Sequence, residues 1–204
     1  YYFSYNVGRP DLISAFFGAT LATMFVGLVF VPKLAERFSK AGAIQIGALF
    51  TVLASIGFYF TPVDAPMWVI FWGCLVALGG APIAVLGWAM IPDTVDYAQW
   101  RFGKRADGAV YSMSSFFQKL AKALGGAGVA TALAAVGYVA NQPQSAETLE
   151  MILNLMTIVP IVLMAAMILL ARLYKLDGEA HAQMRAELAE RYGSEAVESL
   201  PRDY

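Results

Sequence analysis

The chain has 204 residues, of which 59% are hydrophobic and only 14% are charged, whereas soluble domains carry roughly 25% charged residues. The formal net charge of −1 gives no bulk field that would draw nucleic acid. The single cysteine excludes an intrachain disulfide, and the sequence shows neither a nucleophile–base–acid set nor a cluster of metal ligands. We therefore expect no enzymatic activity, no metal site and no nucleic-acid partner.

Five segments are long and apolar enough to cross a bilayer, which takes about 20 residues for a core of roughly 30 Å. They are residues 12–31, 41–60, 67–91, 108–138 and 149–173. The N-terminus lacks the basic region and cleavage site of a signal peptide. We predict an all-α integral membrane protein, organised as an external segment (1–11), a transmembrane bundle (12–175) and a cytoplasmic tail (176–204).

The loops between these segments differ in charge, and this difference predicts the orientation. Basic residues gather after the first, third and fifth segments, and these are Lys33, Arg37, Lys40, Arg101, Lys104, Arg105, Arg172, Lys175, Arg185 and Arg191. The loops at 61–66 and 140–148 contain none. Because lysine and arginine mark the cytoplasmic side, we expect a multi-pass protein of the bacterial inner membrane with a cytoplasmic C-terminus. An external, non-methionine start then suggests that an earlier helix is missing.

The third segment contains GGAPIAVLGWAM at residues 79–90, where Pro82 accompanies three glycines. Small residues allow close helix packing, and proline loosens the backbone ladder. Packing alone and a helix that moves during transport both fit this pattern. Trp88 lies near the cytoplasmic end, where it is either an interfacial anchor or a ring that stacks on a ligand.

Charges are concentrated from residue 92 to residue 119 and continue into the fourth segment with Lys119 and Lys122. These two lysines are three residues apart and share one side of a helix. A charge inside a membrane segment is costly and is usually functional, although a long lysine side chain can also reach the interface by snorkelling.

The polar tail after the fifth segment contains a second helical pattern. Apolar residues recur at Ala180, Met184, Leu188 and Tyr192, a spacing that predicts an amphipathic helix lying on the membrane or on the cytoplasmic loops. His181 has no cysteine or histidine neighbour, so we expect it to be a solvated residue of this helix.

Motifs along the whole chain resemble the glycoside-pentoside-hexuronide:cation symporter family. The most specific are Pro92-Asp93-x-x-Asp96-Tyr97, Gly103-Lys104-Arg105-x-Asp107-Gly108, Ser112 and Gln118-Lys119. The opening Tyr-Tyr-Phe-x-Tyr, the distance from Lys119 to Gly137-Tyr138, and the tail from Tyr174-x-Leu176 through His181 to Arg191 also fit.

The resemblance implies a fold, a function and a set of site residues. The five segments would be helices eight to twelve of a twelve-helix major facilitator fold, whose two halves rock around a central site. The family couples sugar entry to Na⁺, H⁺ or Li⁺, which is bound mainly by carboxylates of an N-terminal half that this chain lacks. Lys119 matches a lysine near that cation site, and Ser115 matches a pocket-lining polar residue.

The resemblance also places the charges after the third segment where the two halves close on the cytoplasmic side. We predict that these residues form inter-domain ion pairs of a gate: Asp93, Asp96, Arg101, Lys104 and Arg105. The alternative is that the bases only set topology and the acids only cap helices.

The expected partners are a sugar or glycoside, a coupling cation, membrane lipid and the N-terminal half of the same protein, and no cofactor is expected. Two other functions stay open. The chain could belong to a major facilitator for an organic acid or a drug, or it could be a membrane scaffold that transports nothing. Two lysines within a segment argue against the scaffold, which gains nothing from their cost.

Overall fold

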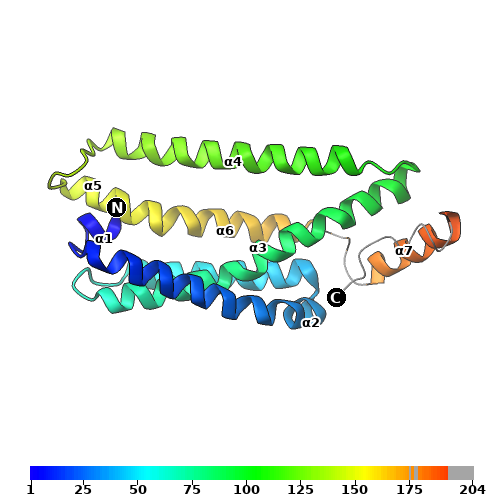
Figure 1. Ribbon diagram of the computed structural model, residues 1–204, viewed down its shortest axis with the longest axis horizontal. Coiled ribbons are helices and arrows are strands. Elements are labelled where there is room, and N and C mark those ends of the chain that lie inside the picture. Colours follow the sequence, from blue (N-terminus) through cyan, green and yellow to red (C-terminus); the bar gives the residue numbers. More distant parts are fainter. Residues whose placement is uncertain (175, 177–178, 193–204) are drawn as a thin grey trace.

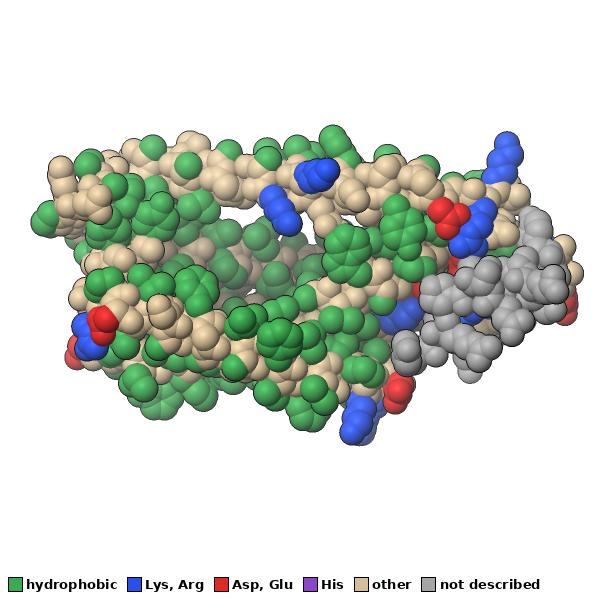
Figure 2. Space-filling model, viewed as in Figure 1, with side chains coloured by type: hydrophobic (Ala, Val, Ile, Leu, Met, Phe, Trp, Pro, Cys, Tyr) green, Lys and Arg blue, Asp and Glu red, His purple; other side chains and the backbone are tan. Residues whose placement is uncertain are grey.

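The structure, a computed structural model, describes residues 1–174, 176 and 179–192, and within these residues it contains helices and no strand. In chain order the elements are α1 (Tyr2–Tyr5), the 3-10 turn η1 (Pro10–Leu12), α2 (Ile13–Tyr59), α3 (Pro66–Phe102), α4 (Asp107–Ala135), α5 (Ala146–Met156), α6 (Ile158–Ala171) and α7 (Glu179–Tyr192). The long helices lie roughly parallel to one another (Figure 1), and hydrophobic side chains cover much of their surface (Figure 2).

Three stretches of the described chain are long and apolar enough to cross a membrane. They are Pro10–Tyr59, Pro66–Phe102 and Ala146–Ala171. The fourth predicted segment forms α4, a helix that is long enough but does not meet the same measure of apolar composition. The predicted all-α membrane class is confirmed.

Helix α2 contains the first two predicted segments, because the chain turns back at one residue rather than through a loop. Ser39 has φ 68° and ψ 167°, a region that residues other than glycine seldom adopt. Its hydroxyl accepts a hydrogen bond from the Gly42 amide at 3.2 Å and so satisfies one of the free donors at the start of the second arm. We call residues 13–38 the first arm and residues 40–59 the second arm.

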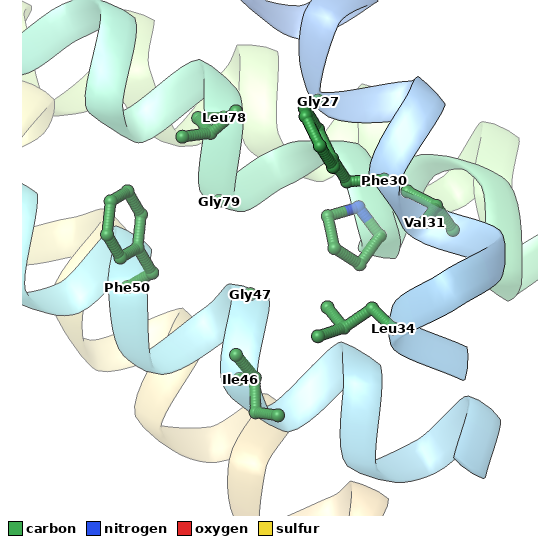
Figure 3. A pocket seen from close by; sticks show the side chains of 10 residues that line it. Gly27, Phe30, Val31, Leu34, Ile46, Gly47, Phe50, Leu78 and Gly79 are labelled. Carbon is green, nitrogen blue, oxygen red and sulfur yellow. The ribbon is translucent and has the colours of Figure 1, made fainter. Parts of the chain in front are cut away.

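Glycines allow α3 to approach both arms closely. A Cβ added to Gly47 would lie 2.5 Å from the Gly79 carbonyl oxygen, and one added to Gly27 would lie 2.9 Å from the Ala81 Cβ. Figure 3 shows Gly47 and Gly79 facing each other between the second arm and α3. Close approach of this kind is how membrane helices gain packing contacts, so packing accounts for Gly79.

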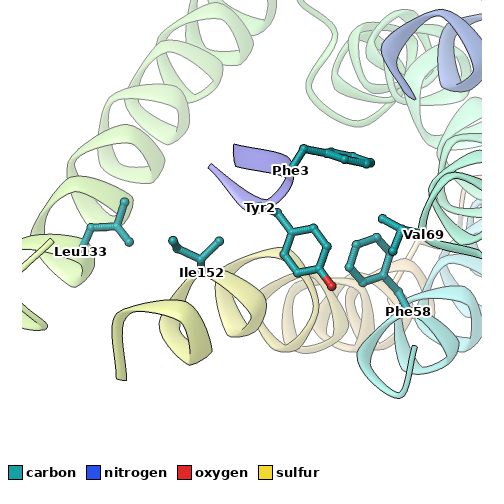
Figure 4. Packing of buried hydrophobic residues seen from close by; sticks show 6 residues of the cluster. All are labelled: Tyr2, Phe3, Phe58, Val69, Leu133 and Ile152. Carbon is teal, nitrogen blue, oxygen red and sulfur yellow. The ribbon is translucent and has the colours of Figure 1, made fainter. Parts of the chain in front are cut away.

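A buried apolar cluster ties the other end of the bundle together. Tyr2 and Phe3 of α1 pack with side chains of α2, α3, α4 and α5 (Figure 4). The cluster consists of Tyr2, Phe3, Phe58, Val69, Leu133 and Ile152. Two rings of the aromatic opening, Tyr2 and Phe3, therefore belong to the core, with at most 4% exposed, whereas Tyr1 is 62% exposed.

Helix α4 stands apart from the rest of the bundle (Figure 1). Leu133 is its one buried residue, and a Cβ on Gly125, Gly126 or Gly128 would meet no atom within 4 Å. The last predicted segment is also divided, because Thr157 leaves helical geometry between α5 and α6. Pro160 follows three residues later and has no amide to donate.

Candidate functional site

Helix α3 carries the predicted gate acids beyond the membrane segment. The segment was expected to end at residue 91, with Asp93 and Asp96 in a loop, but the helix continues to Phe102. It ends at Gly103, whose left-handed conformation (φ 69°) lets its amide bond the Gln99 carbonyl at 2.8 Å. The loop prediction was wrong because Pro92 and the acids are tolerated on this helix.

Asp93 is the centre of a buried cluster that joins four parts of the chain. Lys40 donates to both carboxylate oxygens, at 3.0 and 2.9 Å. The Tyr174 hydroxyl donates to Oδ2 at 3.0 Å, and His181 Nε2 lies 3.5 Å from Oδ1. Asp93 itself is 4% exposed. A carboxylate this deeply buried requires such charged and polar partners.

The position of Lys40 follows from the turn in α2. It is the first residue after Ser39, so the turn that reverses the chain also places Lys40 beside α3. Its side chain is 19% exposed, compared with 6% for the Asp93 side chain. The ion pair therefore fastens the start of the second arm to the extension of α3.

Asp96 lies one turn further along α3 and has a different partner. Arg105, in the connection to α4, approaches Asp96 Oδ1 to 3.4 Å and also binds Asp107 at 2.8 Å. Arg105 is more open to water, with a side chain 39% exposed. Within the described residues, Arg101 and Lys104 form no salt bridge and are exposed.

Helix α7 packs against the extension of α3 and closes the cluster. Met184 and Leu188 are buried, as the predicted amphipathic spacing requires, and the Trp100 indole nitrogen donates to Glu187 at 2.7 Å. The prediction of a solvated His181 was wrong, because this residue is only 7% exposed. The side chains of Ala180 and Tyr192, and all of residues 193–204, lie outside the described residues.

We call Lys40, Asp93, Asp96, Arg105, Tyr174 and His181 the charged cluster. Charged side chains gather at the end of the molecule where α3 meets α7 (Figure 2). Of the five predicted gate residues, the structure brings Asp93, Asp96 and Arg105 into this cluster. Sequence reasoning missed Lys40, Tyr174 and His181. For His181 the signal was available, since it lies three and seven residues before Met184 and Leu188 on the same helical face.

The predicted substrate residues lie elsewhere and are open. Trp88 on α3 is 55% exposed, and Ser115 and Lys119 on α4 are exposed as well. Ser115 and Lys119 are four residues apart and so share one face of α4. Within the described residues, Lys119 forms no salt bridge. Neither Trp88 nor Lys119 lines the two cavities described below.

A cavity of about 400 Å³ does connect α4 with the charged cluster. It lies between α2, α3, α4 and α6, and Gly87 and Ser114, the neighbours of Trp88 and Ser115, are part of its wall. Tyr174 lines the same cavity and also binds Asp93. One hydroxyl group therefore links the space beside α4 to the buried ion pair.

These features define a multi-pass helical membrane protein whose helices meet in a buried ionic cluster at one end. The chain belongs to the family described as MFS/sugar transport protein, which matches residues 1–178. The family resemblance predicted from the motifs is confirmed, and members of this family are transporters.

Curated relatives carry names of the same kind. The chain is 32% identical over 196 residues to an isoprimeverose transporter of Lactiplantibacillus pentosus. The aligned region covers 96% of this chain and 40% of that relative. It is 31% identical to a putative sulfoquinovose importer of Escherichia coli (96% and 42%). It is 34% identical to a putative glycoside/cation symporter of the same organism (86% and 38%). The chain thus spans about 40% of the length of these relatives.

Proposed function

We propose that this chain is the C-terminal part of a cation-coupled symporter for sugars or glycosides that works by alternating access. The observation that carries the proposal is the match of residues 1–178 to a sugar transport family, together with relatives named for glycosides and cation symport. Because the chain covers only about 40% of those relatives, we propose an N-terminal half of the same protein as its partner. Transport without enzymatic chemistry is the function that we assign.

The orientation in this proposal is a cytoplasmic C-terminus in the bacterial inner membrane. The charged cluster and the basic residues near it then lie on the cytoplasmic side. There, the Lys40–Asp93 pair holds the second arm against α3, and α7 covers that pair. Arg101 and Lys104 are exposed beside it, and in this proposal they contact the N-terminal half when the cytoplasmic gate closes.

Lys119 has the coupling role in this proposal. It is exposed on α4, a helix that has little contact with the rest of the chain. A lysine within a membrane bundle requires an anionic partner, which the N-terminal half would supply when the cation site is empty. Na⁺, H⁺ or Li⁺ would compete for that carboxylate, so that ion occupancy changes the contact between the halves.

Uptake by the complete protein in sealed vesicles tests this proposal. We would measure radiolabelled glycosides, isoprimeverose and sulfoquinovose among them, with and without a Na⁺ or H⁺ gradient. The variants are Lys119→Ala and the matched control Lys122→Ala, which removes a lysine one turn away. We expect gradient-driven uptake in the wild type and in Lys122→Ala, and its loss in Lys119→Ala.

Two results would contradict the proposal at different points. Coupled uptake that survives in Lys119→Ala would remove Lys119 from the coupling mechanism but leave sugar transport intact. Absence of uptake for every glycoside under every gradient would reject sugar symport and favour transport of an organic acid or a drug.

A further inference from the structure

An apolar groove lies between the two arms of α2 and α3 and has no role in the proposed transport cycle. Its volume is about 220 Å³, and every residue that lines it is apolar or glycine. Gly47 and Gly79 form its floor, where the helices approach most closely. Phe30 and Phe50 extend from the two arms around it (Figure 3), and they are 58% and 38% exposed.

Two basic side chains follow the groove along the first arm. Lys33 and Arg37 lie three and seven residues after Phe30, so all three share one face of the helix. Both basic residues are exposed. Glu36, six residues after Phe30, points about 120° away from it around the helix axis at about 100° per residue. Glu36 also follows Lys33 by three residues and can reach it, so Lys33, Glu36 and Arg37 together give this exposed part of the first arm a net charge of +1.

The positions of these residues along the helix axis can be compared with the layers of a bilayer leaflet. At about 1.5 Å per residue, Lys33 lies roughly 5 Å and Arg37 roughly 10 Å beyond Phe30 along the helix. The headgroup layer that borders the hydrocarbon core is about 5–8 Å thick on each side. If Phe30 lies in the outermost hydrocarbon, Lys33 lies within the headgroup layer, and Arg37 lies just beyond its outer edge, from which its long side chain can reach back to the lipid phosphates.

We propose that this groove binds one anionic phospholipid. An acyl chain lies between Phe30 and Phe50 over the Gly47–Gly79 floor, and the phosphate contacts Lys33 and Arg37. Charge complementarity selects a lipid over another apolar helix as the occupant, because basic pockets between membrane helices on the cytoplasmic side bind anionic headgroups. The inference requires only that the protein lies in a membrane, so it does not depend on which solute is carried.

Lipid binding by the purified protein tests whether the headgroup contacts the two basic residues. The complete protein, purified in detergent, would be titrated with dioleoylphosphatidylglycerol or with the zwitterionic dioleoylphosphatidylcholine and examined by native mass spectrometry. The double variant Lys33→Gln/Arg37→Gln should bind phosphatidylglycerol about 30-fold more weakly, since each basic residue near the headgroups contributes about 1 kcal/mol. Phosphatidylcholine binding should not change. The control Arg172→Gln/Arg191→Gln removes the same charge and should leave phosphatidylglycerol binding as it is.

A photoreactive phosphatidylglycerol with a diazirine in its acyl chain tests the groove itself in the wild-type protein, independently of any variant's folding. Cross-links should map to residues 27–34 and 46–50, and the same probe with a choline headgroup should label them much less. Equal labelling by both probes would overturn the proposal, as would cross-links that avoid these residues because another helix of the complete protein covers the groove. Unchanged phosphatidylglycerol binding in the double variant would also overturn it.

Discussion

The Lys40–Asp93 pair offers the clearest test of how the charged end of the bundle is held together. The informative perturbation is Asp93→Asn, which keeps the shape of the side chain and removes its charge. In the wild type the carboxylate accepts two hydrogen bonds from Lys40 and one from Tyr174. In the variant, the mostly buried Lys40 ammonium loses its ion pair with Asp93.

The exposed fractions of the two side chains give the size of the effect. Breaking a buried ion pair by removing one partner costs about 3–5 kcal/mol. Because Lys40 keeps 19% of its exposure and Asp93 only 6%, water can partly solvate the lysine, and we expect a loss near the lower limit, about 3 kcal/mol. The Arg9–Asp11 pair, with side chains 56% and 58% exposed, is the matched control, for which Asp11→Asn should cost about 1 kcal/mol or less.

The assay is reversible unfolding of the purified protein in mixed micelles, followed by circular dichroism. Asp93→Asn, Lys40→Gln and the double variant form a double-mutant cycle, and the loss in the double variant should be smaller than the sum of the two single losses because the two side chains interact directly. The reasoning is refuted if Asp93→Asn is no more destabilising than Asp11→Asn. It is also refuted if the two single effects add within about 0.5 kcal/mol, as independent sites do.

Two further predictions concern packing around the same helices. Trp100→Phe removes the 2.7 Å hydrogen bond to Glu187 and should weaken the contact between α7 and α3 by about 1 kcal/mol, detected as faster amide hydrogen exchange in α7 with no change in α6. Gly47→Ala places a methyl group 2.5 Å from the Gly79 carbonyl oxygen and should lower the free energy of unfolding by about 1–3 kcal/mol, whereas Gly80→Ala meets open space. Equal stability of the two alanine variants would contradict the close approach at Gly47.

The helical class and most helices of this protein could be predicted from the sequence, because runs of apolar residues have few alternatives in a membrane. The ends of the helices were harder to predict. The apolar pattern ends before Pro92, yet α3 continues for three turns, and its two acids are paired: Asp93 with the distant Lys40 and Asp96 with Arg105 in the next connection. A charge pattern cannot show that Lys40 pairs with a residue 53 positions later. That pairing depends on the turn at Ser39, a conformation that no local motif predicts.

The sequence predicted only part of the candidate site, again because a charge pattern does not show which distant residues pair. The family motifs led us to predict Asp93, Asp96 and Arg105 as part of one group of charges, and in the structure each of the three forms a salt bridge at the same end of the bundle. Their arrangement differs from the expected one, since both acids find partners within this chain and are buried. Two of the exposed bases, Arg101 and Lys104, are the better candidates for contacts between the two halves. Of the five residues predicted for the gate, the two acids are buried and the three bases are exposed.

The exposed face of α4 shows why Lys119 could be proposed from the sequence but could not be paired from this structure. Ser115, Lys119, Lys122 and Gly126 follow one another at helical spacing and form a single stripe. A Cβ on Gly126 meets open space, and small residues of this kind permit another helix to approach closely. A helix packed against Gly126 would lie about 10 Å along the axis from Lys119. The same stripe therefore combines a glycine that permits close packing with two lysines, which lie four and seven residues before it.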